Sequence, residues 1–332
     1  MKYIRFLLFP FSLLYGLILH LRNKCYDYGI LKSYSFSIPV IVVGNLATGG
    51  TGKSPMIEFL LNHFKTKHRL GVVSRGYKRQ SKGYREVFED STVGEVGDEP
   101  LQIKRKFPDV VVAVSEKRTT GIEKIKNRVE AVLLDDAFQH REVKASQYIL
   151  LTTYYDRYSK DFVLPTGNLR EFRNGAKRAD IIVVTKCPPD LSRRESEQIK
   201  KELNLRNPQK CYFSTIAYAS EIVNHTAKKS LTELKQQIFT LVTGIANPDS
   251  LVAHLKNLGL TFKHSDFPDH HYFSDDELEK IQQEPLIVTT EKDYMRMAPR
   301  LKNPNVYFLP ISVKILFDET PDFLQAVNIE KR

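Results

Sequence analysis

Short apolar runs alternate along the chain with longer stretches in which apolar residues recur every three or four positions. The runs are rich in Val, Ile and Leu, and continuous apolar runs of this length are typical of strands buried on both faces. They lie at residues 38–43, 70–73, 110–114, 131–134, 148–152 and 181–185. Helix-like segments lie between several of them, so the pattern predicts an α/β fold with a doubly wound parallel sheet.

A second series of strand-like runs follows at residues 238–243, 286–290 and 306–312. The polar stretch 220–234 separates the two series, and we take it as the domain boundary. A chain of 332 residues is long enough for two domains that each have a core. We therefore predict a core domain over residues 25–225 and a second, smaller α/β domain over residues 235–332.

The N-terminal residues 1–24 contain an almost wholly apolar run of 14 residues, 6–19, which is short of the ~20 needed to span a bilayer. The residues after it lack the small-residue cleavage site of a signal peptide. Basic side chains stand on either side of the run, namely Lys2, Arg5, Arg22 and Lys24. The pattern predicts an amphipathic helix lying in a membrane interface. The alternative is a terminal helix packed on the protein's own core.

A glycine-rich segment, GNLATGGTGKS at residues 44–54, follows the first strand and precedes an apolar-periodic helix. This arrangement is typical of a phosphate-binding loop, in which backbone N–H groups converge on a polyphosphate at a helix N-terminus. Lys53 would reach the β- and γ-phosphates, and the Ser54 hydroxyl would bind Mg²⁺. The pattern departs from the usual motif at Ala47, where a glycine is expected. The predicted nucleotide-binding residues are Thr48, Gly49, Gly50, Thr51, Gly52, Lys53 and Ser54.

The apolar run at residues 131–134 ends in Asp135 and Asp136, which is the pattern of a Walker B strand. At the carboxyl end of a parallel sheet such a carboxylate lies beside the phosphate-binding loop and can hold Mg²⁺ directly or through water. The sequence does not decide which of the two aspartates contacts the metal. The predicted metal ligands are Ser54, Glu99, Asp135 and Asp136.

Two further segments carry polar side chains that suit a binding site. In GDEP at residues 97–100, Pro100 favours the first turn of a helix, so Asp98 stands at or just before a helix N-terminus. Simple helix capping explains that aspartate equally well. In SRGYKR at residues 74–79, cations and an aromatic residue follow the second strand and suit phosphate or sugar binding, although a solvated basic loop has the same composition.

The cysteine content and the net charge limit the compartment and the kind of partner. The three cysteines, Cys25, Cys187 and Cys211, have no C-x-x-C spacing, so they indicate a reducing compartment and neither a disulfide framework nor a zinc site. The formal net charge of +11 indicates an anionic partner. Nucleic acid, an acidic membrane surface and a phosphorylated substrate all satisfy that charge, and the N-terminal helix favours the membrane.

Six motifs occur in one order, and together they resemble the tetraacyldisaccharide 4′-kinase family, the lipid A kinases of Gram-negative bacteria. The motifs are GNLATGGTGKS (44–54), SRGY (74–77), GDEP (97–100), LDDAFQH (134–140), LPTGNLRE (164–171) and TEKD (290–293). The resemblance extends from the N-terminal helix to about residue 295. This family does not keep the first glycine of the loop, which accounts for Ala47. Ala137 and Asn168 replace an expected Gly and Pro beside the chemical groups.

The resemblance implies a P-loop NTPase-like kinase that uses ATP and Mg²⁺ to phosphorylate the 4′-hydroxyl of a tetraacylated glucosamine disaccharide 1-phosphate. It implies that Asp98 acts on the sugar hydroxyl and that His270 of the Asp269-His270 pair assists it. Together with Lys53 of the phosphate-binding loop, these are the predicted catalytic residues. His271 is adjacent, and either imidazole could face the site. The residues matching substrate-binding positions are Arg75, Tyr77, Arg118, Gln139 and Glu171.

The resemblance also implies where the protein acts and with what. The expected partners are the lipid-borne disaccharide and, through a peripheral contact, an anionic membrane; no nucleic acid is expected. We expect a monomer at the cytoplasmic face of the bacterial inner membrane.

Two other classes of nucleotide-binding protein share parts of this pattern. A membrane-cycling ATPase of the partitioning type has a similar loop and anchor, but it needs a second lysine where this chain has Thr48. A GTP-binding switch protein needs an Asn/Thr-Lys-x-Asp motif, and here Thr185 and Lys186 are followed by Cys187 and Pro188. The ATPase switch is the alternative that we retain.

Overall fold

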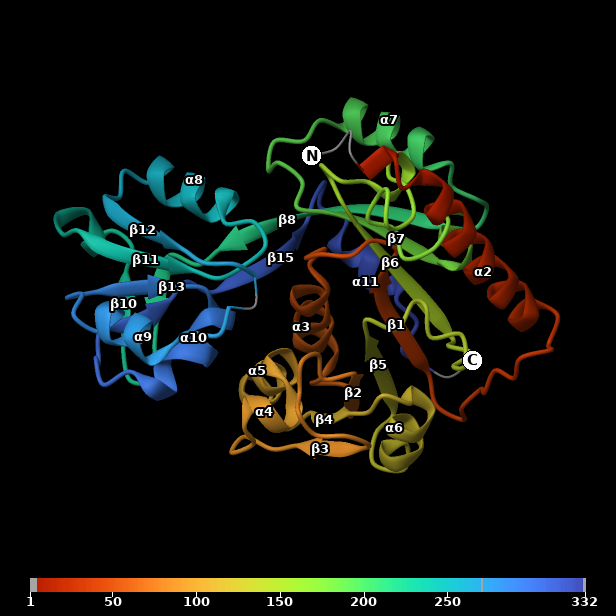
Figure 1. Ribbon diagram of the computed structural model, residues 1–332, viewed down its shortest axis with the longest axis horizontal. Coiled ribbons are helices and arrows are strands. Elements are labelled where there is room, and N and C mark those ends of the chain that lie inside the picture. The colour runs from red at the N-terminus through yellow and green to blue at the C-terminus, as the bar shows by residue number, and fades with distance from the viewer. Residues whose placement is uncertain (1–4, 270, 331–332) are drawn as a thin grey trace. The chain divides into compact units, whose positions relative to one another are not determined.

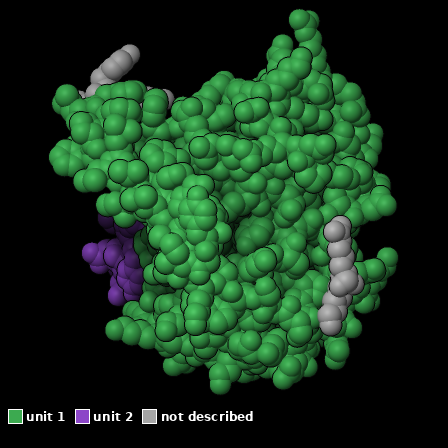
Figure 2. All heavy atoms as spheres, turned by 90° about the vertical axis from the view of Figure 1, so that its right-hand side faces the viewer, with its two compact units in different colours: residues 1–216, 313–332 green, residues 217–312 purple. Residues whose placement is uncertain are grey.

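The computed structural model describes residues 5–269 and 271–330. The chain forms two compact units, which are coloured separately in Figure 2. Unit 1 comprises residues 1–216 and 313–332, and unit 2 comprises residues 217–312. The divisions fall within strands β8 (Lys210–Tyr218) and β15 (Ile311–Ile315).

Unit 1 is built on the nine-stranded sheet, whose order is β15-β8-β7-β6-β1-β5-β2-β4-β3 (Figure 1). Its remaining strands are β1 (Val40–Asn45), β2 (Leu70–Ser74), β3 (Arg85–Val87), β4 (Val111–Val114), β5 (Ala131–Asp135), β6 (Gln147–Thr153) and β7 (Ile181–Thr185). The pairings from β4 through β1 to β8 are parallel, and β3 pairs antiparallel with β4. Each apolar run that predicted a strand in the first series forms one.

The strand order changes direction at β1, because later strands are added on both sides of it. β1 pairs with β5 on one side and β6 on the other, and Val43 is the partner of Asp135 in the parallel register. The carboxyl ends of β1 and β5 therefore lie side by side. Ligands of doubly wound sheets bind outside the carboxyl ends at such a switch point.

Helices cover this sheet. The α-helices of unit 1 are α2 (Phe9–Asp27), α3 (Lys53–Phe64), α4 (Val93–Val96), α5 (Asp98–Lys106), α6 (Arg118–Ile125), α7 (Arg193–Leu203) and α11 (Thr320–Ala326), and the 3₁₀ helices are η1 (Tyr158–Lys160) and η2 (Arg173–Arg178). α3 packs on β1 and β5, and α6 packs on β2 and β4. All six residues of β1 are buried, as expected for a central strand covered on both faces.

Helix α2 begins later and ends later than the helix predicted over residues 1–24, and residues 1–4 lie outside the described part. Pro10 stands in its first turn, where a missing backbone N–H costs no hydrogen bond. Ser12 and Gly16 are its buried residues. The Ser12 hydroxyl donates to Thr166 Oγ1 at 2.7 Å, and a Cβ at Gly16 would lie 2.4 Å from Phe172 Cζ. The helix is thus docked on unit 1 by a narrow stripe.

Most of the apolar side chains of α2 and the residues just before it remain exposed. Those with large exposed fractions are Phe6, Leu7, Leu8, Phe9, Phe11, Leu13, Leu14, Tyr15, Leu17, Ile18 and Leu21. The docked-helix alternative therefore accounts for only part of the apolar run. Among the described helices, none is long and apolar enough to cross a bilayer.

Unit 2 contains the six-stranded sheet, in the order β10-β9-β14-β13-β11-β12. Its strands are β9 (Glu221–Val223), β10 (Lys228–Ser230), β11 (Phe239–Thr243), β12 (Phe262–Asp266), β13 (Ile287–Thr289) and β14 (Val306–Phe308). Its helices are α8 (Asp249–Asn257), α9 (Asp275–Ile281), α10 (Glu291–Met297), η3 (Glu233–Gln236) and η4 (Ala298–Arg300). β14, β13, β11 and β12 pair in parallel, and β9 and β10 extend the sheet in antiparallel fashion. The second series of apolar runs thus forms the central strands of this unit.

The predicted domain limits differ from this division at two places. The polar stretch 220–234 is part of unit 2, because it forms β9, β10 and the start of η3 and buries Leu231 and Leu234. Residues 313–332, which were predicted in the C-terminal domain, belong to unit 1. There Phe323 of α11 is fully buried against Phe59 and Tyr212.

Candidate active site at the phosphate-binding loop

The glycine-rich segment connects the end of β1 at Asn45 to the start of α3 at Lys53. Gly52 precedes the helix with a φ of +85°, a left-handed conformation that favours glycine. The Thr185 hydroxyl at the end of β7 donates to the carbonyl oxygen of Thr51 at 2.8 Å and so ties the loop to the sheet. Ser54 lies buried in the first turn of α3. The loop, strand and helix predicted from the sequence are all present.

Lys53 and Asp136 face each other across this edge of the sheet. The Lys53 ammonium lies 3.7 Å from Asp136 Oδ1, and Arg170 Nη1 donates to both carboxylate oxygens of Asp136 at 2.9 and 3.0 Å. Burial by itself would raise the pKa of Asp136. The positive charges of Lys53 and Arg170 outweigh that effect and hold the pKa of Asp136 below its usual range. Asp136 is therefore ionised at neutral pH and is held by two cations.

Asp135 is the last residue of β5 and is almost completely buried. The Ser74 hydroxyl donates to its Oδ2 atom at 3.2 Å, and no described group hydrogen-bonds its Oδ1 atom. Burial, followed by the negative charges of Glu99 and Asp136, raises the pKa of Asp135. A buried carboxylate oxygen without a hydrogen-bond partner is energetically costly. A cation, or a water molecule bound to a cation, would therefore stabilise Asp135.

Arg118 begins α6, is buried, and interacts electrostatically with Asp135 and Asp136. Its guanidinium donates to the carbonyl oxygens of Ser115 at 2.8 Å and Asp135 at 3.4 Å. Burial lowers the pKa of Arg118 to about 10 against the opposing effect of Asp135 and Asp136. Burial and the charge of Arg118 lower the pKa of His140 to about 4, which leaves that imidazole neutral at pH 7. Arg118 is placed to contribute positive charge to this site.

The GDEP and SRGY segments lie against each other. A Cβ at Gly97 would lie 3.2 Å from Gly76 Cα, and Gly97 has a φ of +88°, so both the contact and the backbone favour glycine. Asp98 is the first residue of α5 and is buried; its Oδ1 atom accepts the backbone N–H of Glu99 at 2.9 Å. The predicted helix start at this motif is confirmed. Tyr77 is exposed.

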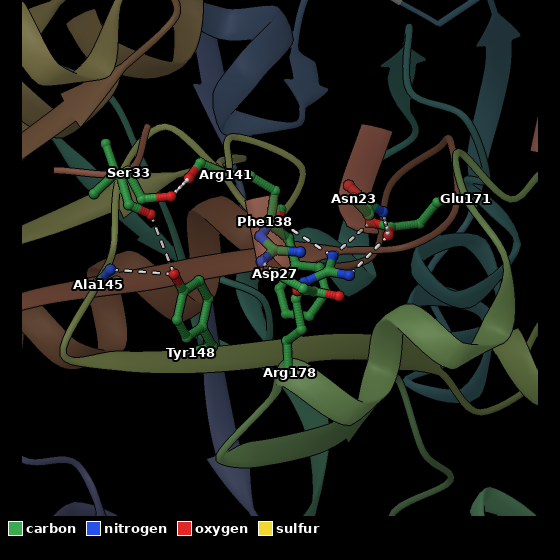
Figure 3. Close-up of polar contacts among 10 residues, drawn as sticks. Asn23, Asp27, Ser33, Phe138, Arg141, Ala145, Tyr148, Glu171 and Arg178 are labelled. Atoms are coloured by element: carbon green, nitrogen blue, oxygen red, sulfur yellow. Dashed lines mark hydrogen bonds and ion pairs between the residues drawn. The ribbon is translucent and has the colours of Figure 1, made fainter. Parts of the chain in front are cut away.

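Gln139 and Glu171 are joined to each other in the structure. Gln139 Nε2 donates to the carbonyl oxygen of Asn45 at 2.9 Å and to Glu171 Oε1 at 3.1 Å. Glu171 is buried and also accepts hydrogen bonds from Arg178 at 2.7 and 2.9 Å and from Asn23 of α2 at 2.9 Å. Figure 3 shows Asn23, Glu171 and Arg178 pointing toward one another. Both Glu171 oxygens are thus engaged within the protein.

One predicted residue cannot be placed. His270 lies outside the described residues, so its pairing with Asp98 stays a prediction. Its neighbour His271 is in unit 2, where its Nε2 atom lies 2.9 Å from Glu277 Oε2.

Comparison with known proteins gives the chain its family. Residues 4–329 match the family model described as LpxK, tetraacyldisaccharide-1-P 4′-kinase. The chain belongs to this family. It is 49% identical to a tetraacyldisaccharide 4′-kinase of Flavobacterium johnsoniae over 94% of this chain and 93% of that protein. It is 41% identical to the protein of that name from Bacteroides thetaiotaomicron over 96% of this chain and 91% of the relative.

A solved structure is similar as well. LpxK from Aquifex aeolicus, in complex with ATP, superposes with a TM-score of 0.78 at 31% identity, covering 97% of this chain and 98% of that one. The family, the α/β fold and the kinase class predicted from the sequence motifs are thereby confirmed. The partitioning-type ATPase is not favoured.

The structure adds residues to the site of this family member that the sequence did not single out. Arg170 binds Asp136, and Ser74 binds Asp135. Lys186 follows β7 with a φ of +56°, and a Cβ at Gly50 would lie 3.9 Å from its ammonium nitrogen. All three lie within or beside segments that the sequence analysis discussed because of other residues. Their position after parallel strands or within a motif is the only signal that could have identified them.

Proposed function

We propose that this protein transfers the γ-phosphoryl group of ATP to the 4′-hydroxyl of a lipid-borne tetraacylated glucosamine disaccharide 1-phosphate. The observation that carries the proposal is the Lys53–Asp136 pair beside a phosphate-binding loop at the switch point of the sheet, in a member of this kinase family. The loop N–H groups of residues 48–54 bind the polyphosphate. Lys53 stabilises negative charge that develops on the transferring group.

The residues at this edge of the sheet fit Mg²⁺. Ser54 offers a hydroxyl, and Asp135 offers a carboxylate oxygen that lacks a hydrogen-bond partner within the described chain. No three His, Cys, Asp or Glu side chains of residues 5–269 and 271–330 form a metal-binding group. Mg²⁺ in kinases needs only one or two protein ligands, because phosphates and water supply the rest. Asp136 and Glu99 are the other proposed ligands. When bound, the ion would neutralise phosphate charge.

Asp98 is the proposed base for the sugar hydroxyl, and His270 assists it. The proposed substrate-binding residues are Arg75, Tyr77, Arg118, Gln139 and Glu171, and Glu171 also holds Gln139 through a hydrogen bond. Asp98→Ala should lower kcat far more than it raises the KM for ATP. If Asp98 and His270 serve one step, the double variant should cost much less than the sum of the single losses. Fully additive losses would show that the two act independently.

The exposed apolar side chains of α2 support peripheral contact with an anionic membrane, and we place the protein as a monomer on the cytoplasmic face of the inner membrane. Deleting residues 1–24 should release the protein from anionic vesicles while ATP binding is kept, since the loop follows β1. If the truncated chain still binds vesicles, another surface of the protein makes the membrane contact.

The reaction itself is tested by incubating the protein with Mg²⁺-ATP and the purified disaccharide 1-phosphate in detergent micelles. Mass spectrometry should detect a bis-phosphorylated lipid, and Lys53→Ala should abolish it. ATP hydrolysis stimulated by vesicles without any phosphorylated lipid would support the ATPase switch instead.

A further inference from the structure

A cavity of about 320 Å³ lies in unit 1 beside the C-terminal half of α2. It is bounded by α2, by η2 and the residues before it, and by the side chains of Arg141 and Arg206. The predicted nucleotide-binding residues 48–54 do not line it. It is therefore separate from the phosphate-binding loop.

The cavity lies along the C-terminal half of α2, where polar side chains such as Asn23 and Asp27 join the helix to the rest of unit 1. At Ser12 and Gly16 the helix touches unit 1 directly. Further along, His20, Asn23, Lys24 and Asp27 line the cavity, and their spacing of three or four residues places them on one face of the helix. The opening thus lies along the same helix whose other side chains form the exposed apolar surface.

The lining carries more positive than negative charge. It contains the five cations Lys24, Arg141, Lys177, Arg178 and Arg206, against only Asp27 and Glu171. Arg141 is paired with Asp27 at 2.8 Å, and Arg178 is paired with Glu171 at 2.7 Å. The other three cations have no ion-pair partner among the described residues, and all three are exposed. An excess of about three positive charges around one cavity favours an anion with several oxygens.

Arg178 gives the cavity a rigid wall. Its guanidinium stacks 4.7 Å from the Phe138 ring centroid and binds both oxygens of Glu171 (Figure 3). Its Nε atom is buried and has no hydrogen-bond partner within the described chain. A buried donor without a protein partner is typical of a place where a water or an ion binds.

We propose that this cavity binds a phosphate group carried by a membrane lipid. The inference rests on the proposed membrane contact of α2, which would place the cavity mouth near lipid headgroups. The phosphate has two possible sources with the same chemistry: an anionic glycerophospholipid of the bilayer, or the 1-phosphate of the disaccharide substrate. Lys24, Lys177 and Arg206 supply the flexible contacts at the rim, and Arg178 supplies the fixed one.

The test compares the double variant Lys177→Ser/Arg206→Ser with the control Lys67→Ser/Arg194→Ser. The control removes the same charge from exposed positions of unit 1 that do not line the cavity. One arm measures binding to phosphatidylcholine vesicles with and without phosphatidylglycerol. The other measures, in detergent micelles, the KM for the disaccharide with and without its 1-phosphate.

In at least one arm, the cavity variant should show a loss about tenfold larger than that of the control. The loss is in affinity for phosphatidylglycerol vesicles in the first arm and in the KM preference for the 1-phosphate in the second. A loss confined to phosphatidylglycerol vesicles assigns the site to bilayer lipid, and a loss confined to the 1-phosphate preference assigns it to substrate. Equal behaviour of both double variants in both arms would overturn the proposal. The vesicle arm needs no catalysis, so it remains readable even if the proposed reaction fails.

Discussion

The Glu171 carboxylate offers the sharpest test, because its predicted role in substrate binding and its observed contacts lead to different outcomes. It is only 3% exposed and accepts four hydrogen bonds, two of them from Arg178, whose side chain is 18% exposed. Breaking a buried ion pair by removing one partner costs about 3–5 kcal/mol. In Glu171→Gln the amide oxygen retains some of these bonds, and Arg178 partly reaches water. We therefore expect the free energy of unfolding to fall by about 3 kcal/mol.

For a domain of this size such a loss lowers Tm by roughly 6–12 °C, which differential scanning calorimetry resolves. The matched control is Glu197→Gln on α7, because Glu197 is 61% exposed and pairs with Lys200 one turn away. That control should change stability by less than about 0.5 kcal/mol. If Glu171→Gln unfolds like the control and only raises the KM for the lipid, the carboxylate contacts substrate and the structural reasoning is wrong.

Three further changes test other parts of the molecule. Lys53→Ala should leave Tm within a few degrees of wild type and lower kcat by at least about a hundredfold, because a loop lysine stabilises the transferring phosphoryl group. Near-normal turnover in a steady-state assay would refute the phosphate-loop assignment. Gly16→Val should cost about 1–3 kcal/mol in a urea titration, since even a Cβ would lie 2.4 Å from Phe172 Cζ, whereas Leu17→Val on the exposed face should cost little. Burial raises the pKa of Glu202, but hydrogen bonds from Arg157, Ser159 and Lys160 lower it to about 2, so its contribution to stability is present above pH ~4.5 and is lost as pH falls toward 2. Glu202→Gln should therefore be less stable at pH 7 and show a shallower loss between pH 4.5 and 2, and an unchanged acid limb would contradict this.

Contiguous features were readable from the sequence. The strand, glycine-rich turn and helix around Lys53 occupy one short segment, so their residue types and order specify the local structure without reference to the rest of the chain. The same holds for the strand that ends at Asp135 and for the helix that begins at Asp98. The order of such motifs also sufficed to identify the family.

Other properties were decided only by contacts between residues far apart in the chain. Residues 313–332 belong to unit 1 because Phe323 is buried there, and no periodicity indicates which core a terminal helix joins. Arg170 reaches Asp136, and Glu171 turns inward to Arg178, because the fold brings their segments together; the sequence shows only their charges. The apolar run of α2 likewise leaves open which residues pack, and only the approach of Phe172 to Gly16 decides it. Local patterns report the conformation of a segment, whereas pairing and burial depend on which segments meet.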